Sequence, residues 1–163
     1  MTKAQSFLKE LKEEAVATRK ILEVVPLEKA DWKPHEKSMS LGRLATHVAE
    51  IPSWFEITLL QDVLDFAASE YKPNVVNNSG DLLALLDKNL DRAEKILSTF
   101  PDNKMQDNWT MRSGEAVYFS LPKEQVVRTW CLNHWYHHRA QLGVYLRLLN
   151  VHLPGTYGPS ADM

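Results

Sequence analysis

The sequence has few of the features that define secreted or membrane-bound proteins. Its 163 residues include one cysteine, Cys131, so an internal disulfide is impossible and no oxidising compartment is required. No apolar run approaches the roughly 20 residues of a membrane span, and the charged N-terminal segment lacks the apolar stretch of a signal peptide. We therefore expect a cytoplasmic protein with no membrane partner.

An excess of charge of one sign is also missing. The 19 Lys and Arg residues and the 21 Asp and Glu residues give a formal net charge of −2, and no block of basic residues builds a positive face. Nucleic-acid binding relies on such a face, so we expect no nucleic-acid partner. The hydrophobic fraction of 44% and the length fit one soluble globular domain over residues 1–163.

Helical periodicity is the main pattern that the sequence does contain. Apolar residues recur at three- and four-residue steps in four stretches, which predicts four helices. We expect these helices over about residues 3–25, 41–59, 80–100 and 122–149. Their predicted boundary residues are Thr2, Ser40 and Ser79 as N-caps, Pro122 at the first position of the last helix, and Asn150 as a left-handed terminator.

Pro52 lies inside the second helical pattern. A proline has no N–H, so it cannot bond to the carbonyl of Val48, and its ring crowds the preceding turn. We therefore expect a kink one turn beyond His47.

The remaining segments lack helical periodicity. Residues 108–121 combine β-branched and aromatic residues around Ser113 and Gly114, which indicates a short hairpin or an extended loop. Residues 27–39 and the tail from Pro154 read as irregular. The predicted fold class is all-α: a four-helix bundle with a possible short hairpin before the last helix.

The last helix carries two histidines at the spacing of metal ligands. His134 and His138 are four residues apart, so their side chains lie one above the other on one helix face and can converge on one ion. They belong to a four-three series that is typical of a bundle seam: Val127, Cys131, His134, His138, Gln141, Tyr145 and Leu148. Two core histidines satisfied by hydrogen bonds remain the alternative. Trp135 stands where a zinc-protease helix has its glutamate, which disfavours a protease.

His47 is the candidate third ligand. It lies in the second helix at the edge of the apolar stripe, where an unpaired imidazole would be costly to bury. Three neutral nitrogen ligands leave at least one coordination position open, which is the pattern of a catalytic site.

Other chemically interesting residues fit ordinary roles. His137 is turned about 100° from His138 around the helix and reads as a surface or neighbouring residue. Cys131 is one turn from His134, but a lone helical cysteine is more often packing material. The other residues we consider are exposed His35 and His152, Trp54 and Trp135 as borders of the site, and Arg112 and Arg139 as anion-attracting groups.

Two motifs resemble the DinB/YfiT-like superfamily. The segment Leu-Gly-Arg-Leu-Ala-Thr-His-Val-Ala-Glu-Ile-Pro-Ser-Trp around His47 is similar to the first family motif, and His-Trp-Tyr-His-His-Arg-Ala-Gln-Leu from His134 is similar to the second. The segments Trp-Lys-Pro-His-Glu-Lys-Ser-Met-Ser and Leu-Pro-Gly-Thr-Tyr-Gly-Pro-Ser-Ala-Asp also read as this family. Ala140 departs from the Gly of the usual Arg-Gly-Gln, a mild change.

The resemblance implies a four-helix bundle with a long crossover connection and one divalent metal ion, usually zinc or nickel. The family's ligand positions map onto His47, His134 and His138. The resemblance also implies a homodimer. Its relatives include thiol-dependent S-transferases and isomerases that use low-molecular-weight thiols, although many members have no known reaction.

Three functions follow as hypotheses. The first is a metal-dependent enzyme, of thiol-dependent S-transferase or hydrolase type, that acts on a small molecule. In it, Glu50 is the nearest candidate proton acceptor, or is merely solvated. The second is a non-catalytic metal-binding or stress-related bundle, and the third is a plain bundle with core histidines.

Overall fold

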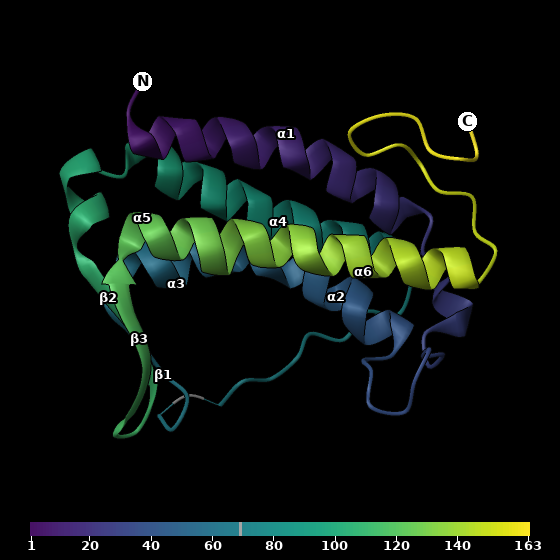
Figure 1. The fold of residues 1–163 in the computed structure, drawn as a ribbon, viewed down its shortest axis with the longest axis horizontal. Helices are drawn as coiled ribbons and strands as arrows, with labels where there is room; N and C mark the ends of the chain where they lie inside the picture. The colour runs from purple at the N-terminus through teal and green to yellow at the C-terminus, as the bar shows by residue number, and fades with distance from the viewer. Residues whose placement is uncertain (69) are drawn as a thin grey trace.

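The computed structural model describes residues 1–68 and 70–163, and helices dominate them. Four long helical units lie side by side (Figure 1). They are α1 (Lys3–Glu23); α2 (Leu41–Glu50), the 3₁₀ turn η2 (Ile51–Ser53) and α3 (Trp54–Leu60); α4 (Ser79–Thr99); and α5 (Lys123–Val126), the π-helical segment η4 (Val127–Asn133) and α6 (His134–Leu148). Two further 3₁₀ turns are η1 (Leu27–Lys29) and η3 (Asp102–Gln106).

The apolar stripes of the four units meet in one core. Helix α1 packs against α4, and α2 packs against both α4 and α6. The core includes Leu11 and Leu22 from α1, Leu44 from α2, Leu86 from α4 and Leu142 from α6, all at most 1% exposed. Complete burial of such a side chain contributes about 1.5–3 kcal/mol, which explains why the periodic stretches become these helices.

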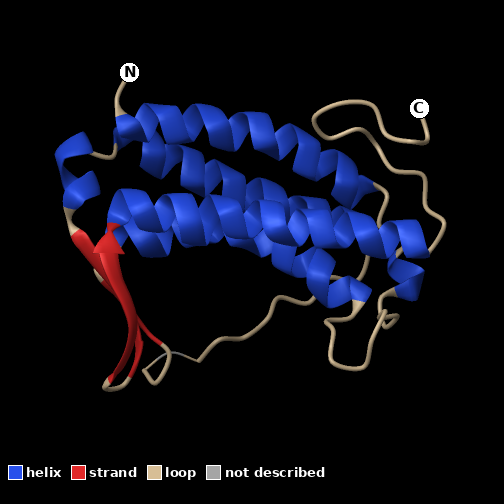
Figure 2. Ribbon diagram, in the orientation of Figure 1, coloured by secondary structure: helices blue, strands red, loops and turns tan. Residues whose placement is uncertain are grey.

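A small sheet lies at one end of the bundle (Figure 2). It consists of β1 (Val63–Asp65), β2 (Asn108–Ser113) and β3 (Ala116–Pro122) in the order β1-β2-β3, with β1 parallel to β2 and β2 antiparallel to β3. The expected hairpin is therefore confirmed, and Gly114 takes the positive φ of 58° that its turn requires. The described chain is mostly helical with four helical units, as predicted, but it is not all-α, because β1 extends the hairpin to a three-stranded sheet.

The long crossover is the chain between α3 and α4. It leaves the sheet and returns along the bundle to the end where α2 begins, so that α2 and α4 run in the same direction (Figure 1). Asn74, within this segment, donates its backbone and side-chain N–H groups to the Glu50 carboxylate at 2.9 Å each. The crossover is thereby attached to the end of α2.

Two predicted boundary residues differ by one position. Asn78, not Ser79, is the N-cap of α4, because its side-chain oxygen accepts from the backbone N–H of Asp81 at 2.9 Å. Pro122 ends β3 and precedes the helix instead of opening it. The expected caps Thr2 and Ser40 are confirmed, and Asn150 has a positive φ of 58°.

Pro52 interrupts the second unit as the sequence predicts. Helix α2 ends at Glu50, and Pro52 lies in the turn η2. Pro52 has no N–H to donate to the carbonyl of Val48. That carbonyl accepts instead from the indole Nε1–H of Trp135 in α6, at 2.9 Å. The next carbonyl, that of Ala49, accepts from the Asn89 side chain of α4 at 2.9 Å. The break in α2 is therefore satisfied by side chains of the two helices packed against it.

We predict that Trp135→Phe lowers the free energy of unfolding by about 1–3 kcal/mol, because the buried Val48 carbonyl loses its donor. The matched control is Trp32→Phe, since Trp32 packs edge-on against the ring of Tyr145 and not against a carbonyl. Urea unfolding measures both. Equal losses in the two variants would contradict a specific role for the indole N–H.

Candidate metal centre

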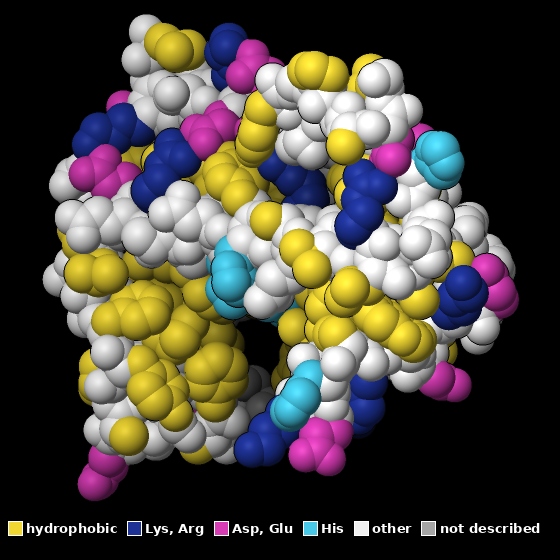
Figure 3. Space-filling model, turned by 45° about the vertical axis from the view of Figure 1, so that its right-hand side comes forward, with side chains coloured by type: hydrophobic (Ala, Val, Ile, Leu, Met, Phe, Trp, Pro, Cys, Tyr) yellow, Lys and Arg dark blue, Asp and Glu magenta, His cyan; other side chains and the backbone are white. Residues whose placement is uncertain are grey.

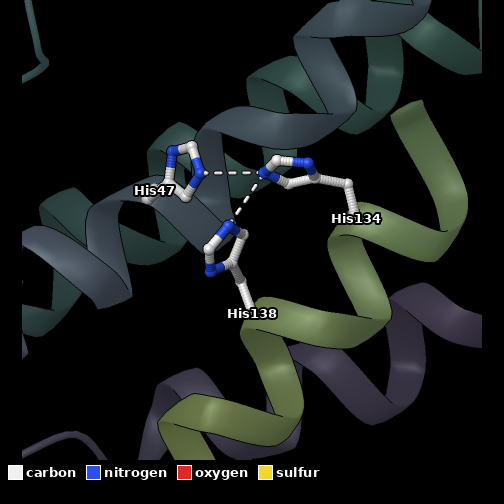
Figure 4. A group of neighbouring side chains, drawn as sticks. All are labelled: His47, His134 and His138. Atoms are coloured by element: carbon white, nitrogen blue, oxygen red, sulfur yellow. Dashed lines mark hydrogen bonds between the residues drawn. The ribbon is translucent and has the colours of Figure 1, made fainter. Parts of the chain in front are cut away.

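Three histidine side chains converge between α2 and α6 (Figure 4). His47 comes from α2, and His134 and His138 come from successive turns of α6. The Nε2 atom of His134 lies 3.4 Å from Nε2 of His47 and 2.8 Å from Nε2 of His138. The sequence-predicted trio is thus brought together.

The donor set fits a divalent metal ion. Nitrogen ligands at about 2.0–2.1 Å from a zinc ion lie about 3.3 Å apart at a tetrahedral angle and about 2.9 Å apart at a right angle. The two Nε2 separations of 3.4 and 2.8 Å match these values. Among the described residues, this is the group of histidine, cysteine and acidic side chains whose ligand atoms lie within 4.8 Å of one another.

The predicted seam of the last helix is wrong at Gln141 and Leu148, whereas His134, His138 and Tyr145 are partly buried. Gln141 and Leu148 are exposed, whereas Trp135, Leu142 and Leu146 are buried. The buried series advances by four residues from Val127 through Trp135, a wider step than the 3.6 residues of an α-helical turn. The π-helical segment η4 accommodates that step, since its hydrogen bonds span five residues. His134 and His138 therefore lie beside the core stripe and are partly buried.

The ring of His138 is oriented from behind, because its Nδ1 lies 2.7 Å from Oε1 of Gln141, one turn further along α6. A partner that accepts the Nδ1 proton in this way keeps the lone pair of Nε2 directed at the common centre. Nδ1 of His47 lies 3.5 Å from Nη2 of Arg43 and 3.7 Å from Oε2 of Glu50, so it lies beside the Arg43–Glu50 ion pair.

Glu50 is not solvated, as one sequence interpretation had it; it is 4% exposed. Arg43 Nη1 donates to its Oε2 at 3.0 Å, and Tyr71 donates to the same oxygen at 2.9 Å. Burial alone would raise the pKa of Glu50, but hydrogen bonds from His47, Asn74 and Tyr71 outweigh burial and hold the pKa at about 2. Glu50 is therefore a fixed negative charge behind His47.

The imidazoles of His134 and His138 are neutral at physiological pH. Burial is the largest cause in both and, with the adjacent imidazoles, lowers each pKa to about 4; the Gln141 hydrogen bond opposes the shift at His138. Neutral rings are the form that binds metals.

The histidines open into a mainly apolar cavity of about 540 Å³. Figure 3 shows hydrophobic side chains gathered beside a hollow with histidine at its rim. The other lining residues are Arg43, Trp54, Ile57, Leu64, Phe66, Glu70, Tyr71 and Trp130.

Several other sequence expectations have clear outcomes. Trp54 borders the site as expected. Trp135 does not, because its side chain is fully buried and donates to the carbonyl of Val48. Cys131 is packing material: it is buried beside Thr58, and burial raises the pKa of its thiol to about 12. His35, His137 and His152 are exposed.

Neither arginine proposed to attract an anion lies in the cavity. Arg139 is buried and pairs with Glu14, and Arg112 pairs with Asp65. Sequence reasoning missed several lining residues, which are Arg43, Ile57, Leu64, Phe66, Glu70, Tyr71 and Trp130. Arg43 precedes His47 by four residues and Trp130 precedes His134 by four, so helix periodicity is a signal that could have found these two.

The bundle and its histidine cluster define the class of protein: a DinB-like four-helix fold with a candidate metal centre at the α2–α6 contact. The DinB family model matches residues 1–162, and the chain belongs to the DinB family. No curated protein matches the chain. No helix among residues 1–68 and 70–163 has the length and apolar character to cross a membrane.

Solved structures share this fold. A DinB-like protein from Bacillus cereus is 22% identical, with a TM-score of 0.68 over 94% of this chain and 97% of that one. One from Bacillus subtilis is 17% identical, with a TM-score of 0.67 over 95% and 96%. A structure described as a putative DinB family member from Exiguobacterium sibiricum is 19% identical, with a TM-score of 0.62 over 99% and 97%.

Proposed function

We propose that the chain binds one divalent metal ion, zinc or nickel, through Nε2 of His47, His134 and His138. We further propose that it is a metal-dependent enzyme of thiol-dependent S-transferase or hydrolase type. The observation that carries this proposal is that the three Nε2 atoms converge at the wall of a cavity large enough for a small molecule. A metal held by these residues would lie beside space for a further ligand.

The ligand chemistry supports catalysis. Three neutral imidazoles supply no negative charge, so a bound ion would keep its full positive charge and lower the pKa of a coordinated thiol or water. The lining around the histidines is mainly apolar, and electrostatic interactions are stronger in apolar surroundings than in bulk water. A low-molecular-weight thiol as cosubstrate is part of the proposal and rests on the family resemblance, as does a homodimer.

Glu50 serves best as a positioning residue in this proposal. Its carboxylate faces Nδ1 of His47, and Arg43, Tyr71 and Asn74 donate to it. A carboxylate so strongly stabilised in its charged form, with a pKa of about 2, is a weak base. The proton acceptor for a coordinated thiol or water is therefore better sought in the solvent or in the substrate.

A non-catalytic metal-binding bundle is the second candidate. The observation in its favour is that the ligands come from two different helices, so an ion would cross-link α2 and α6. Because the core at the helix contacts is already apolar, we expect the bundle to fold without that cross-link.

We predict that the purified protein contains one equivalent of zinc or nickel per chain and that His134→Ala loses it. His137→Ala is the matched control, because His137 is the adjacent, exposed residue of the same helix. Elemental analysis after dialysis measures the metal content. A wild-type protein without stoichiometric metal, or a His137→Ala variant that loses the metal equally, would contradict the proposed site.

We predict that Gln141→Ala weakens metal binding by about 10- to 100-fold without abolishing it, because the His138 ring loses the partner that orients it. Gln125→Ala, an exposed substitution in α5, is the control. Competition with a chelator of known affinity gives both constants. An unchanged affinity in Gln141→Ala would show that the hydrogen bond plays no part in binding.

We predict that the metal-free protein still unfolds in one cooperative transition, at a lower temperature than the metal-loaded protein. Binding to the native state alone must raise stability, but the apolar core remains without the ion. Thermal unfolding with and without chelator tests this expectation. Loss of the cooperative transition on chelation would favour the structural metal over the catalytic one.

A further inference from the structure

We propose that the metal-side cavity selects a ligand that carries an uncharged, planar apolar group, such as a phenyl or larger aromatic ring, next to its metal-binding donor. This inference rests on the proposed function, because it assigns the substrate class of the same site. The residues that determine the selection are Trp54 and Trp130 on one part of the cavity and Leu64 and Phe66 on another.

The first observation is a pair of stacked indoles beside the ligands. Trp54 and Trp130 have ring centroids 4.5 Å apart and planes 13° apart, and both remain partly exposed. Trp54 also lies edge-on to His47 and His134, at centroid distances of 5.4 and 4.9 Å. Trp54 is therefore an immediate neighbour of two of the three proposed ligands.

The second observation is that both indoles line the cavity and remain partly exposed, although Trp130 also packs against Trp109 at a ring-centroid distance of 5.1 Å. Two other tryptophans are fully buried and hydrogen-bonded within the protein. Trp109 donates to the carbonyl of Ile57, and Trp135 donates to that of Val48. Burying large aromatic surface is favourable, so a partly exposed aromatic wall in a concave site marks a place for an apolar ligand.

The sheet supplies further apolar lining. Leu64 from β1 and Phe66, just after β1, line the cavity together with Ile57 from α3. Phe66 is 46% exposed although it is a large apolar residue. The cavity volume of about 540 Å³ leaves room for a ring beyond the metal-binding atoms.

The partly buried arginine of the cavity is already paired, which disfavours an anionic ligand. Arg43 forms an ion pair with the buried Glu50 at 3.0 Å, whereas Glu70 is solvent-exposed, with 85% of its side chain accessible. An anionic substrate would have to compete with the Glu50 carboxylate for Arg43. An uncharged ring requires no such exchange.

Two small metal-binding probes separate these contributions. Acetohydroxamic acid and benzohydroxamic acid have the same metal-binding head and differ in a methyl or a phenyl group. In zinc-loaded protein we expect benzohydroxamic acid to bind at least about tenfold more tightly, because its ring is removed from water against the indoles. Isothermal titration calorimetry measures both dissociation constants. A ratio near one overturns the proposal.

Variants show whether the preference arises in this cavity. Trp130→Leu and Phe66→Ala should each reduce the ratio several-fold. Phe66 is exposed, so its substitution tests the proposal even if Trp130→Leu fails to fold. Tyr118→Ala is the matched control, because Tyr118 is a neighbouring exposed aromatic outside the cavity lining. A ratio that persists in Phe66→Ala contradicts the assignment.

A metal-free experiment separates this inference from the proposed function. We expect 2-naphthol, which needs no metal, to quench the tryptophan fluorescence of chelator-treated wild type more strongly than that of Phe66→Ala. If the protein binds no metal but 2-naphthol binds in this way, the metal proposal fails and the aromatic site stands. If metal and both hydroxamates bind without preference and 2-naphthol does not bind, the metal proposal stands and the aromatic site fails.

Discussion

The candidate site depends on one hydrogen bond, from the indole Nε1–H of Trp135 to the carbonyl of Val48. Pro52 leaves that carbonyl without its helical donor, and a buried carbonyl without a donor is costly. Trp135 satisfies it from α6 and thereby fixes α2 against α6 at one level. His47 and His134 are the residues immediately before Val48 and Trp135 in the chain. The same contact therefore sets the level at which the first two imidazoles meet.

The π-helical segment before α6 completes this arrangement. It lets the buried face continue through Trp135 while His134 and His138 lie at the edge of the core, next to the cavity. If the histidines were deeply buried, they would be hydrogen-bonded core residues. If they were fully exposed, they would not line a cavity. The intermediate position supports the proposal that a metal held there is open to a ligand on one side and dry on the other.

The sequence predicted the local features well. The four-residue spacing of His134 and His138, the Pro52 break and the Gly114 hairpin turn all follow from short-range rules, and each is confirmed. For His47 the residues alone offer only its place at the edge of the apolar stripe, and the family motif marks it as a ligand position. Features that depend on distant segments escaped prediction. Strand β1 has three residues and exists because it pairs with β2, and Glu50 is buried by donors from the irregular crossover.

The central claim is that three imidazole nitrogens hold one ion and leave room for a further ligand. X-ray absorption at the edge of the bound metal measures the ligand types and distances directly. We predict three imidazole nitrogens at about 2.0–2.1 Å, with one or more oxygen atoms of water completing the shell and no sulfur. A shell with fewer than three imidazoles, or one that contains the sulfur of Cys131, would contradict the claim.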